Sequence, residues 1–253
     1  MNEHPHTCPI DNDPKTKLDT DKKKVNKPDA KIPAKNKVTL KTISMDITDR
    51  QKRMVDELKM GLDAVRSYPK TVTFFGSARL KPGTEYYEKA RRLGARCCEL
   101  GYGVITGGGP GIMQAGNQGT YEQCGTGIGF NIELPFEQVA NPYVTHGVDF
   151  YYFFTRKVSM TFAGEAYLVF PGGFGTLDEF FEILTLVQTK KMQKVPIILV
   201  GTKFWGPLQK WIETTMRDKH ETISPGDINL YRIMDDEDEI MKIIKKAKLR
   251  EED

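Results

Sequence analysis

The sequence predicts an α/β fold in which a doubly wound, Rossmann-like parallel sheet carries helices on both faces within a single domain. Short runs rich in Val, Ile, Leu and Phe alternate along the chain with longer segments of helical periodicity. These runs are continuously apolar, as expected for parallel strands that are buried on both faces. Glycine-rich turns follow three of the runs, and in such sheets ligands bind at the carboxyl ends of the strands.

An amphipathic helix is expected before the sheet. Its apolar residues recur at helical spacing on one face, and Lys and Arg occupy the other face. The apolar face consists of Met54, Val55, Leu58, Leu62 and Val65. We expect this helix to pack on the core or to form a contact between subunits.

Strands and helices then alternate to the end of the chain. β-Branched and aromatic residues predict strands over 71–77, 103–107, 126–132, 143–150, 166–170 and 195–201. Helical periodicity predicts helices over 86–100, 110–123, 153–163, 176–190, 205–217 and 235–248. Pro110 suits the first turn of its helix because that position needs no backbone N–H donor. Neither an internal repeat nor a second folded domain is expected.

Composition divides the chain into two parts. Of the 253 residues, 39% are hydrophobic, which is enough for a sizeable core. Residues 1–41 hold ten lysines against six acidic residues, and the first aromatic residue of the chain is Tyr68. Such a segment buries too little apolar surface to offset its ordering entropy. We therefore predict a disordered basic tail over 1–45 and one folded domain over 46–253.

The remaining compositional features exclude several classes of protein. A solvated extension is favoured for the basic tail over a contact with nucleic acid or an anionic membrane. The tail lacks the apolar core of a signal peptide, and no run approaches the roughly 20 apolar residues that span a bilayer. Cys8, Cys97, Cys98 and Cys124 lack the paired spacing of metal ligands. We expect buried, reduced thiols and a cytoplasmic location.

Three glycine-rich turns, over 76–79, 106–113 and 170–179, are the candidate ligand-binding elements. Glycine permits close approach of the backbone to a ligand, which main-chain binding of phosphate requires. Strand-to-helix turns also need glycine for steric reasons, so the indication comes from the convergence of all three on one sheet edge. The chain lacks a P-loop pattern and a clean dinucleotide-binding pattern, so a mononucleotide fits better than NAD.

Two charged residues are candidates for chemistry, and each has a purely structural alternative. Glu179 follows Thr176 at the spacing of a capping box, in which both side chains only satisfy amides at a helix start. It can equally be the acid beside a phosphate cradle. Arg156 can clamp a phosphate with its planar guanidinium, or it can form a salt bridge on a helix surface.

The segment over 171–179, PGGFGTLDE, resembles the PGGxGTxxE motif of the LOG (Lonely Guy) family. Members of that family are cytokinin riboside 5′-monophosphate phosphoribohydrolases, formerly labelled lysine decarboxylases. The resemblance extends to 75–77, 106–113, Asn117 and 156–157, and it covers roughly residues 70–202, about half of the chain. The segments before and after this region exceed the compact plant-type members.

The resemblance implies roles for individual residues. Arg156 and Glu179 correspond to the paired catalytic residues of the family. The implied substrate-binding residues are Ser77, Gly107, Gly108, Gly109, Asn117, Lys157, Gly172, Gly173, Gly175 and Thr176. A carboxylate beside the ribose would stabilise the positive charge that builds on the sugar during glycosidic cleavage.

The implied activity is cleavage of the N-glycosidic bond of a purine nucleoside 5′-monophosphate, either AMP or an N6-substituted AMP, to free base and ribose 5-phosphate. The resemblance implies no metal and no other cofactor, a homo-oligomer of two or more subunits, and no membrane or nucleic-acid partner. The folded domain is then a nucleotide-binding catalytic domain. The alternative is a non-catalytic nucleotide or molybdenum-cofactor carrier of the same fold.

Overall fold

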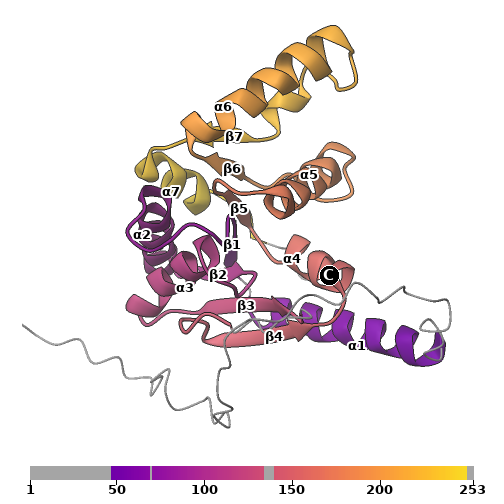
Figure 1. The fold of residues 1–253 in the computed structure, drawn as a ribbon, viewed down its shortest axis with the longest axis vertical. Helices are drawn as coiled ribbons and strands as arrows, with labels where there is room; N and C mark the ends of the chain where they lie inside the picture. The colour runs from indigo at the N-terminus through magenta and orange to yellow at the C-terminus, as the bar shows by residue number, and fades with distance from the viewer. Residues whose placement is uncertain (1–46, 69, 134–139, 250–253) are drawn as a thin grey trace, which may run out of the picture.

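The computed structural model describes residues 47–68, 70–133 and 140–249. Within these residues, seven strands form one sheet in the order β4-β3-β2-β1-β5-β6-β7, and every neighbouring pair is parallel. The predicted α/β class is therefore confirmed (Figure 1). The tail predicted over 1–45 lies outside the described residues, and the domain boundaries stay a prediction.

The bounds of the elements follow the predicted alternation. The strands are β1 (Thr71–Phe75), β2 (Gly103–Thr106), β3 (Gly127–Ile132), β4 (His146–Phe150), β5 (Ala166–Val169), β6 (Ile197–Val200) and β7 (Arg232–Met234). The helices are α1 (Ile47–Arg66), α2 (Glu85–Glu99), α3 (Ile112–Glu122), α4 (Phe153–Thr161), α5 (Phe174–Gln188), α6 (Thr202–Trp211) and α7 (Glu237–Lys245). A π-helix over Ile212–Lys219 continues α6, and a short 3-10 helix over Asp227–Asn229 precedes β7.

Helices cover both faces of the sheet, as Figure 1 shows. On one face lie α2, α3 and α7, and their residues Leu93, Ile112 and Ile240 are fully buried in one apolar cluster with the sheet. On the other face lie α4, α5 and α6, with α1 beside β4 and α4. This arrangement explains why the central strands β1, β5 and β6 are buried on both faces.

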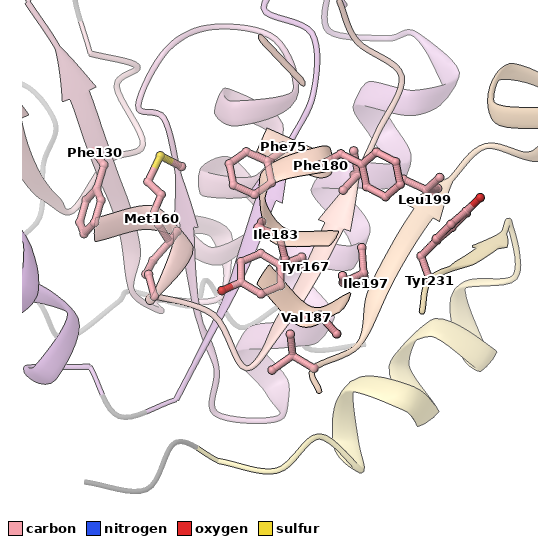
Figure 2. Packing of buried hydrophobic residues seen from close by; sticks show 14 of the residues in the cluster. Phe75, Phe130, Met160, Tyr167, Phe180, Ile183, Val187, Ile197, Leu199 and Tyr231 are labelled. Atoms are coloured by element: carbon pink, nitrogen blue, oxygen red, sulfur yellow. The ribbon is translucent and has the colours of Figure 1, made fainter. Parts of the chain in front are cut away.

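The cluster on the α5 side fixes the helix that carries Glu179 (Figure 2). Phe75 of β1 and Tyr167 of β5 stack with ring centroids 6.3 Å apart and planes 8° apart. Phe180 of α5 is fully buried, and its ring meets Tyr231 edge-on at 5.3 Å. Because Phe180 follows Glu179 directly, burial of its ring restricts the position of the preceding carboxylate.

The two central strands create the crevice in which doubly wound proteins bind ligands. β1 and β5 are paired over their length, from Val72 with Ala166 to Phe75 with Val169. The chain leaves β1 toward α2 on one face and leaves β5 toward α5 on the opposite face. The turns after these two strands therefore diverge, and a crevice opens between them at the carboxyl edge.

Several helix features differ from the sequence prediction. α3 begins at Ile112, not at Pro110, because Gly111 before it has a φ of 71°, which a right-handed helix does not accommodate. α5 begins at Phe174, two residues earlier than predicted. On α1, Val55 of the predicted apolar face is 63% exposed, whereas Glu57, which is outside that face, is buried.

β7 is absent from the sequence prediction. Its three residues lie at the edge of the sheet and pair with Ile198, Leu199 and Val200 of β6. A strand this short and only partly buried has no continuous apolar run, so its sequence carries no strand pattern.

Two compositional expectations can be compared with the structure. Cys97 is buried and Cys98 is partly buried, both as free thiols, but Cys124 is exposed and disulfide-bonded, so the expectation of a buried, reduced thiol is wrong for that residue. Across 47–68, 70–133 and 140–249, every helix is too short or too polar to cross a bilayer.

Candidate active site

The three glycine turns meet at the carboxyl edge of the sheet, where the backbone of Ser77 is hydrogen-bonded to the other two turns. Its N–H donates to the carbonyl of Pro171 at 3.0 Å, and its carbonyl accepts from the N–H of Ile112 at 3.1 Å. Gly111 permits this approach, since a Cβ on it would lie 2.2 Å from the Ser77 carbonyl oxygen. The convergence predicted from the sequence is therefore observed.

A cavity of about 760 Å³ lies between these turns and α4. Nine of the twelve predicted site residues line it: Ser77, Gly107, Arg156, Lys157, Gly172, Gly173, Gly175, Thr176 and Glu179. The two predicted catalytic side chains thus face the same space, although one comes from α4 and the other from α5. The volume is within the range of small-molecule sites.

Three predicted residues, Gly108, Gly109 and Asn117, do not line the cavity. Asn117 is fully buried, and its Oδ1 accepts from Thr106 Oγ1 at 2.7 Å and from Asn141 Nδ2 at 3.1 Å. The Asn141 amide also donates to the carbonyls of Gly108 and Gly109, at 3.1 Å each. Asn117 and Asn141 therefore support the second turn from behind; Asn117 does not line the cavity, and its role in binding stays a prediction.

The first turn of α5 presents open backbone to the cavity. A Cβ on Gly173 or Gly175 would meet no atom within 4 Å, so packing within the described chain does not require glycine at either position. Gly172 differs, because a Cβ there would lie 2.1 Å from Thr176 Oγ1. The first N–H groups of a helix have no intrahelical acceptor and attract anions. The steric alternative thus explains Gly172 but not Gly173 or Gly175.

The capping-box alternative for Glu179 is wrong. The N-cap residue of α5 is Gly173, and Thr176 lies inside the helix, with its N–H donating to the Gly173 carbonyl at 3.0 Å. Glu179 is a further turn along the helix, too far to satisfy the amides at its start. A capping box places its Thr at the N-cap, and this helix begins earlier than the sequence suggests.

Glu179 is a buried carboxylate without a full set of partners. Its side chain belongs to a residue that is only 9% exposed, and Oε2 has no hydrogen-bond partner among the described residues. Burial raises its pKa to about 7, against the opposing charges of Arg156 and Lys157. A carboxyl group with this pKa exchanges a proton near neutral pH.

Arg156 is held by backbone carbonyls rather than by a carboxylate. Its Nε donates to the Phe130 carbonyl at 2.7 Å, and its Nη2 contacts the Gly107 carbonyl at 3.5 Å. Gly107 permits this, since a Cβ there would lie 2.1 Å from Nη2. Burial lowers the pKa of Arg156, and the charge of Glu179 opposes that shift. The surface salt-bridge alternative is therefore wrong for Arg156.

Lys157 lines the cavity but is already paired with acids. Its Nζ lies 2.8 Å from Asp178 Oδ2 and 2.9 Å from Glu182 Oε2. Burial opposes its protonation, but these partners raise its pKa to about 12. The paired ammonium also contributes to the field at Glu179.

Several lining residues are absent from the predicted catalytic and substrate-binding residues. Arg79, in the turn after β1, is exposed at the cavity, and in the described part of the chain no carboxylate lies within 4.0 Å of its guanidinium. Phe153 and Phe174 line the same cavity and are 57% and 93% exposed. Two sequence features could have indicated these residues: the position of Arg79 beside a glycine turn, and the aromatic run before Arg156. In the same described ranges, no group of three His, Cys, Asp or Glu side chains is placed to hold a metal ion.

Comparison with known proteins identifies relatives of this chain. A family profile described as "Possible lysine decarboxylase" matches residues 113–244. The cytokinin riboside 5′-monophosphate phosphoribohydrolase of Rhodococcoides fascians is 30% identical over 154 residues, which cover 58% of this chain and 76% of that protein. The cytokinin riboside 5′-monophosphate phosphoribohydrolase LOG of Oryza sativa subsp. japonica is 26% identical over 153 residues, which cover 57% of this chain and 60% of that protein.

Solved structures share the fold at lower identity. The molybdenum cofactor carrier protein of Chlamydomonas reinhardtii is 19% identical with a TM-score of 0.52, and the match covers 70% of this chain and 97% of that one. The molybdenum cofactor binding protein of Rippkaea orientalis is 18% identical with a TM-score of 0.51, covering 70% and 96%. At these identities the likeness extends to the fold alone.

Proposed function

This chain belongs to the LOG family, whose matching profile is described as possible lysine decarboxylase, and from that membership we propose that it is a phosphoribohydrolase. The proposed reaction is cleavage of the N-glycosidic bond of a purine nucleoside 5′-monophosphate to free base and ribose 5-phosphate. AMP and N6-substituted AMP are the proposed substrates. The names of the two curated relatives support this class of reaction.

The observation that carries the proposal is the environment of Glu179. Its carboxylate faces a cavity lined by open glycine backbone, and Oε2 has no hydrogen-bond partner among the residues described. An unsatisfied buried carboxylate lowers stability, so its presence calls for a functional explanation. A positively charged transition state next to Glu179 supplies one, because an oxocarbenium-like sugar would complement that charge.

The proposed chemistry uses Glu179 first as an electrostatic partner and then as a base. The bond between C1′ of the ribose and the ring nitrogen of the base breaks, and its electron pair leaves with the base. The oxygen of water bonds to C1′, and Glu179 takes the proton that water loses. That proton passes through solvent to the departing base, so the reaction consumes one water. A pKa of about 7 suits both accepting and returning this proton.

The other groups bind and orient the nucleotide. The first-turn amides of α5 at Phe174 and Gly175 would bind the 5′-phosphate at the positive end of the helix. Arg156, held by the Phe130 and Gly107 carbonyls, would orient the nucleotide and offset negative charge on the phosphate or on the leaving base.

The proposal is tested with the purified full chain and three substrates: AMP, N6-isopentenyladenosine 5′-monophosphate and adenosine. Free base and ribose 5-phosphate are separated by chromatography. We expect base release from one or both monophosphates, and far less from adenosine because it lacks the anchoring phosphate. Absence of base release from every purine monophosphate would refute the proposal.

A matched pair of variants tests the role of Glu179. Glu179→Gln should lower kcat by about 100-fold or more while nucleotide binding is retained. Glu182→Gln, three residues along the same helix and paired with Lys157, should retain turnover. Wild-type kcat in Glu179→Gln would refute the assigned role.

The carrier alternative predicts tight binding of a nucleotide or pterin without turnover. Only the shared fold supports it here, since the similar carrier structures are below 25% identity. The expected homo-oligomer and the cytoplasmic location stay predictions.

A further inference from the structure

We propose that Glu57 of α1 is a positioning residue that fixes the amino end of α4 and thereby sets Arg156 in the cavity. The inference rests on the proposed function for the role of Arg156. It assigns a part of the active-site support to a helix that precedes the 113–244 segment matched by the family profile.

Glu57 supplies the cap that α4 lacks. The N-cap residue Tyr152 makes no side-chain capping bond of its own. Instead, Glu57 Oε1 accepts the N–H of Tyr151 at 3.1 Å, and Oε2 accepts the N–H of Tyr152 at 3.2 Å. Oε2 also accepts the Thr155 hydroxyl at 2.7 Å. A carboxylate at this end also interacts favourably with the helix dipole.

The capped turn is the turn that carries Arg156. Thr155 is its chain neighbour, and the Arg156 N–H donates to the Tyr152 carbonyl at 3.3 Å. The guanidinium, by contrast, bonds to carbonyls outside α4, at Phe130 and Gly107. A displacement of the capped turn would therefore move Arg156 relative to both acceptors. Misplacement by about 1 Å can cost on the order of 100-fold in rate.

Glu57 is itself held rigidly. It is 6% exposed, and Oε1 accepts from Arg53 Nε at 3.1 Å. The Arg53 guanidinium also lies over the Tyr151 ring, 3.9 Å from its centroid. Along the same helix, a Cβ on Gly61 would lie 2.1 Å from Ser159 Oγ, so α1 and α4 are in close contact. The anchor is therefore coupled to α4 over two turns.

The charge of Glu57 is maintained at neutral pH. Burial alone would raise its pKa, but hydrogen bonds from Thr155, Tyr152, Tyr151 and Arg53 outweigh that effect and lower the pKa below its ordinary value. The backbone N–H groups of Tyr151 and Tyr152 can only donate, and each faces a different oxygen of Glu57, so both positions require an acceptor. Glutamine at this position would direct an NH₂ group at a donor.

A double-mutant cycle tests the inference on the full chain. Glu57→Gln should lower kcat about 10- to 100-fold with wild-type Arg156, but change it by less than about threefold in an Arg156→Lys background. If Glu57→Gln fails to fold, the isosteric Thr155→Val replaces it in the cycle, because it removes one of the bonds to Glu57. It should lower kcat with wild-type Arg156 and change it little in the Arg156→Lys background. Glu165→Gln is the matched control: this carboxylate is fully buried at the opposite end of the sheet, where it accepts the Thr71 N–H.

Hydrogen exchange gives a second readout that needs no turnover. In the ligand-free protein, Glu57→Gln should accelerate amide exchange over 151–157 and leave the first turn of α5 unchanged. Equal kcat losses in both Arg156 backgrounds, or unchanged exchange over 151–157, would overturn the inference. Absence of wild-type turnover would refute the proposed function instead, and the exchange measurement would still decide whether Glu57 holds α4.

Discussion

Replacing Glu179 by Gln should stabilise the protein at alkaline pH while removing its activity. The carboxylate is 9% exposed, and Oε2 lacks a hydrogen-bond partner in the described structure. Ionised, it is a buried charge whose interactions with Arg156 and Lys157 do not compensate for the lost hydration. Residues that serve chemistry in this way commonly reduce stability.

The magnitude follows from the pKa shift. Burial raises the pKa of Glu179 from 4.5 to about 7, and each unit corresponds to about 1.4 kcal/mol. Because the folded pKa is raised, the destabilisation is absent below the unfolded pKa and grows as pH rises toward 7. The full effect at pH 8 is roughly 3 kcal/mol, against less than about 1 kcal/mol near pH 5. For a chain of this size, that corresponds to roughly 5–10 °C in Tm.

The assay is thermal unfolding of wild type and Glu179→Gln, followed by circular dichroism from pH 5 to pH 8. The glutamine amide is also a buried polar group, so the difference between the two pH values is the diagnostic quantity. Glu182→Gln is the control, since Glu182 is paired with Lys157 and its side chain is 30% exposed. If wild type and Glu179→Gln have the same pH dependence of Tm, the assignment of a raised pKa to Glu179 is wrong.

Three further predictions concern the lining and support of the cavity. Arg79→Met should raise KM for a purine monophosphate about 10- to 100-fold with little change in kcat, whereas the same change at exposed Arg232 on β7 should have no effect. Gly175→Ala should weaken nucleotide binding about tenfold in calorimetry without loss of Tm, and Gly206→Ala, which also meets no neighbour, should leave binding unchanged. Asn117→Ala should lower the free energy of unfolding by about 2–3 kcal/mol in urea, with KM nearly unchanged; a large KM change at constant stability would restore Asn117 as a binding residue.

The fold was predictable because strand burial is recorded in continuous apolar runs. The central strands β1, β2, β5 and β6 have buried runs of this kind, and their spacing by helical segments is typical of parallel pairing, whereas β4 contains polar residues and is mostly exposed. β7 has no such run, because its three residues are at most partly buried at the edge of the sheet, where they pair with β6. The start of α5 was misplaced because Thr176 has the residue type of an N-cap, although Gly173 occupies that position.

The site was predictable where backbone geometry is local and unpredictable where it depends on contacts between distant segments. Glycine turns after strands indicated the carboxyl edge, and the motif resemblance supplied Arg156 and Glu179, which line one cavity. Asn117 has the same local pattern as a ligand-binding residue, but its Oδ1 accepts hydrogen bonds from Thr106 and Asn141. Glu57 gave no sequence signal, because its partners on α4 lie 94 to 98 residues away.

The environment of Glu179 favours catalysis over simple binding of an anion. A site that only carries an anion gains affinity from amides and guanidinium groups, and a carboxylate beside the anion would weaken it through like-charge repulsion. This cavity nevertheless retains Glu179 at a cost to stability, next to glycines whose open backbone favours an anion. The two features are compatible if positive charge develops between them. A ribose 5-phosphate that loses its base develops such charge at C1′ while its phosphate stays on the amides, so the carboxylate acts mainly on the transition state.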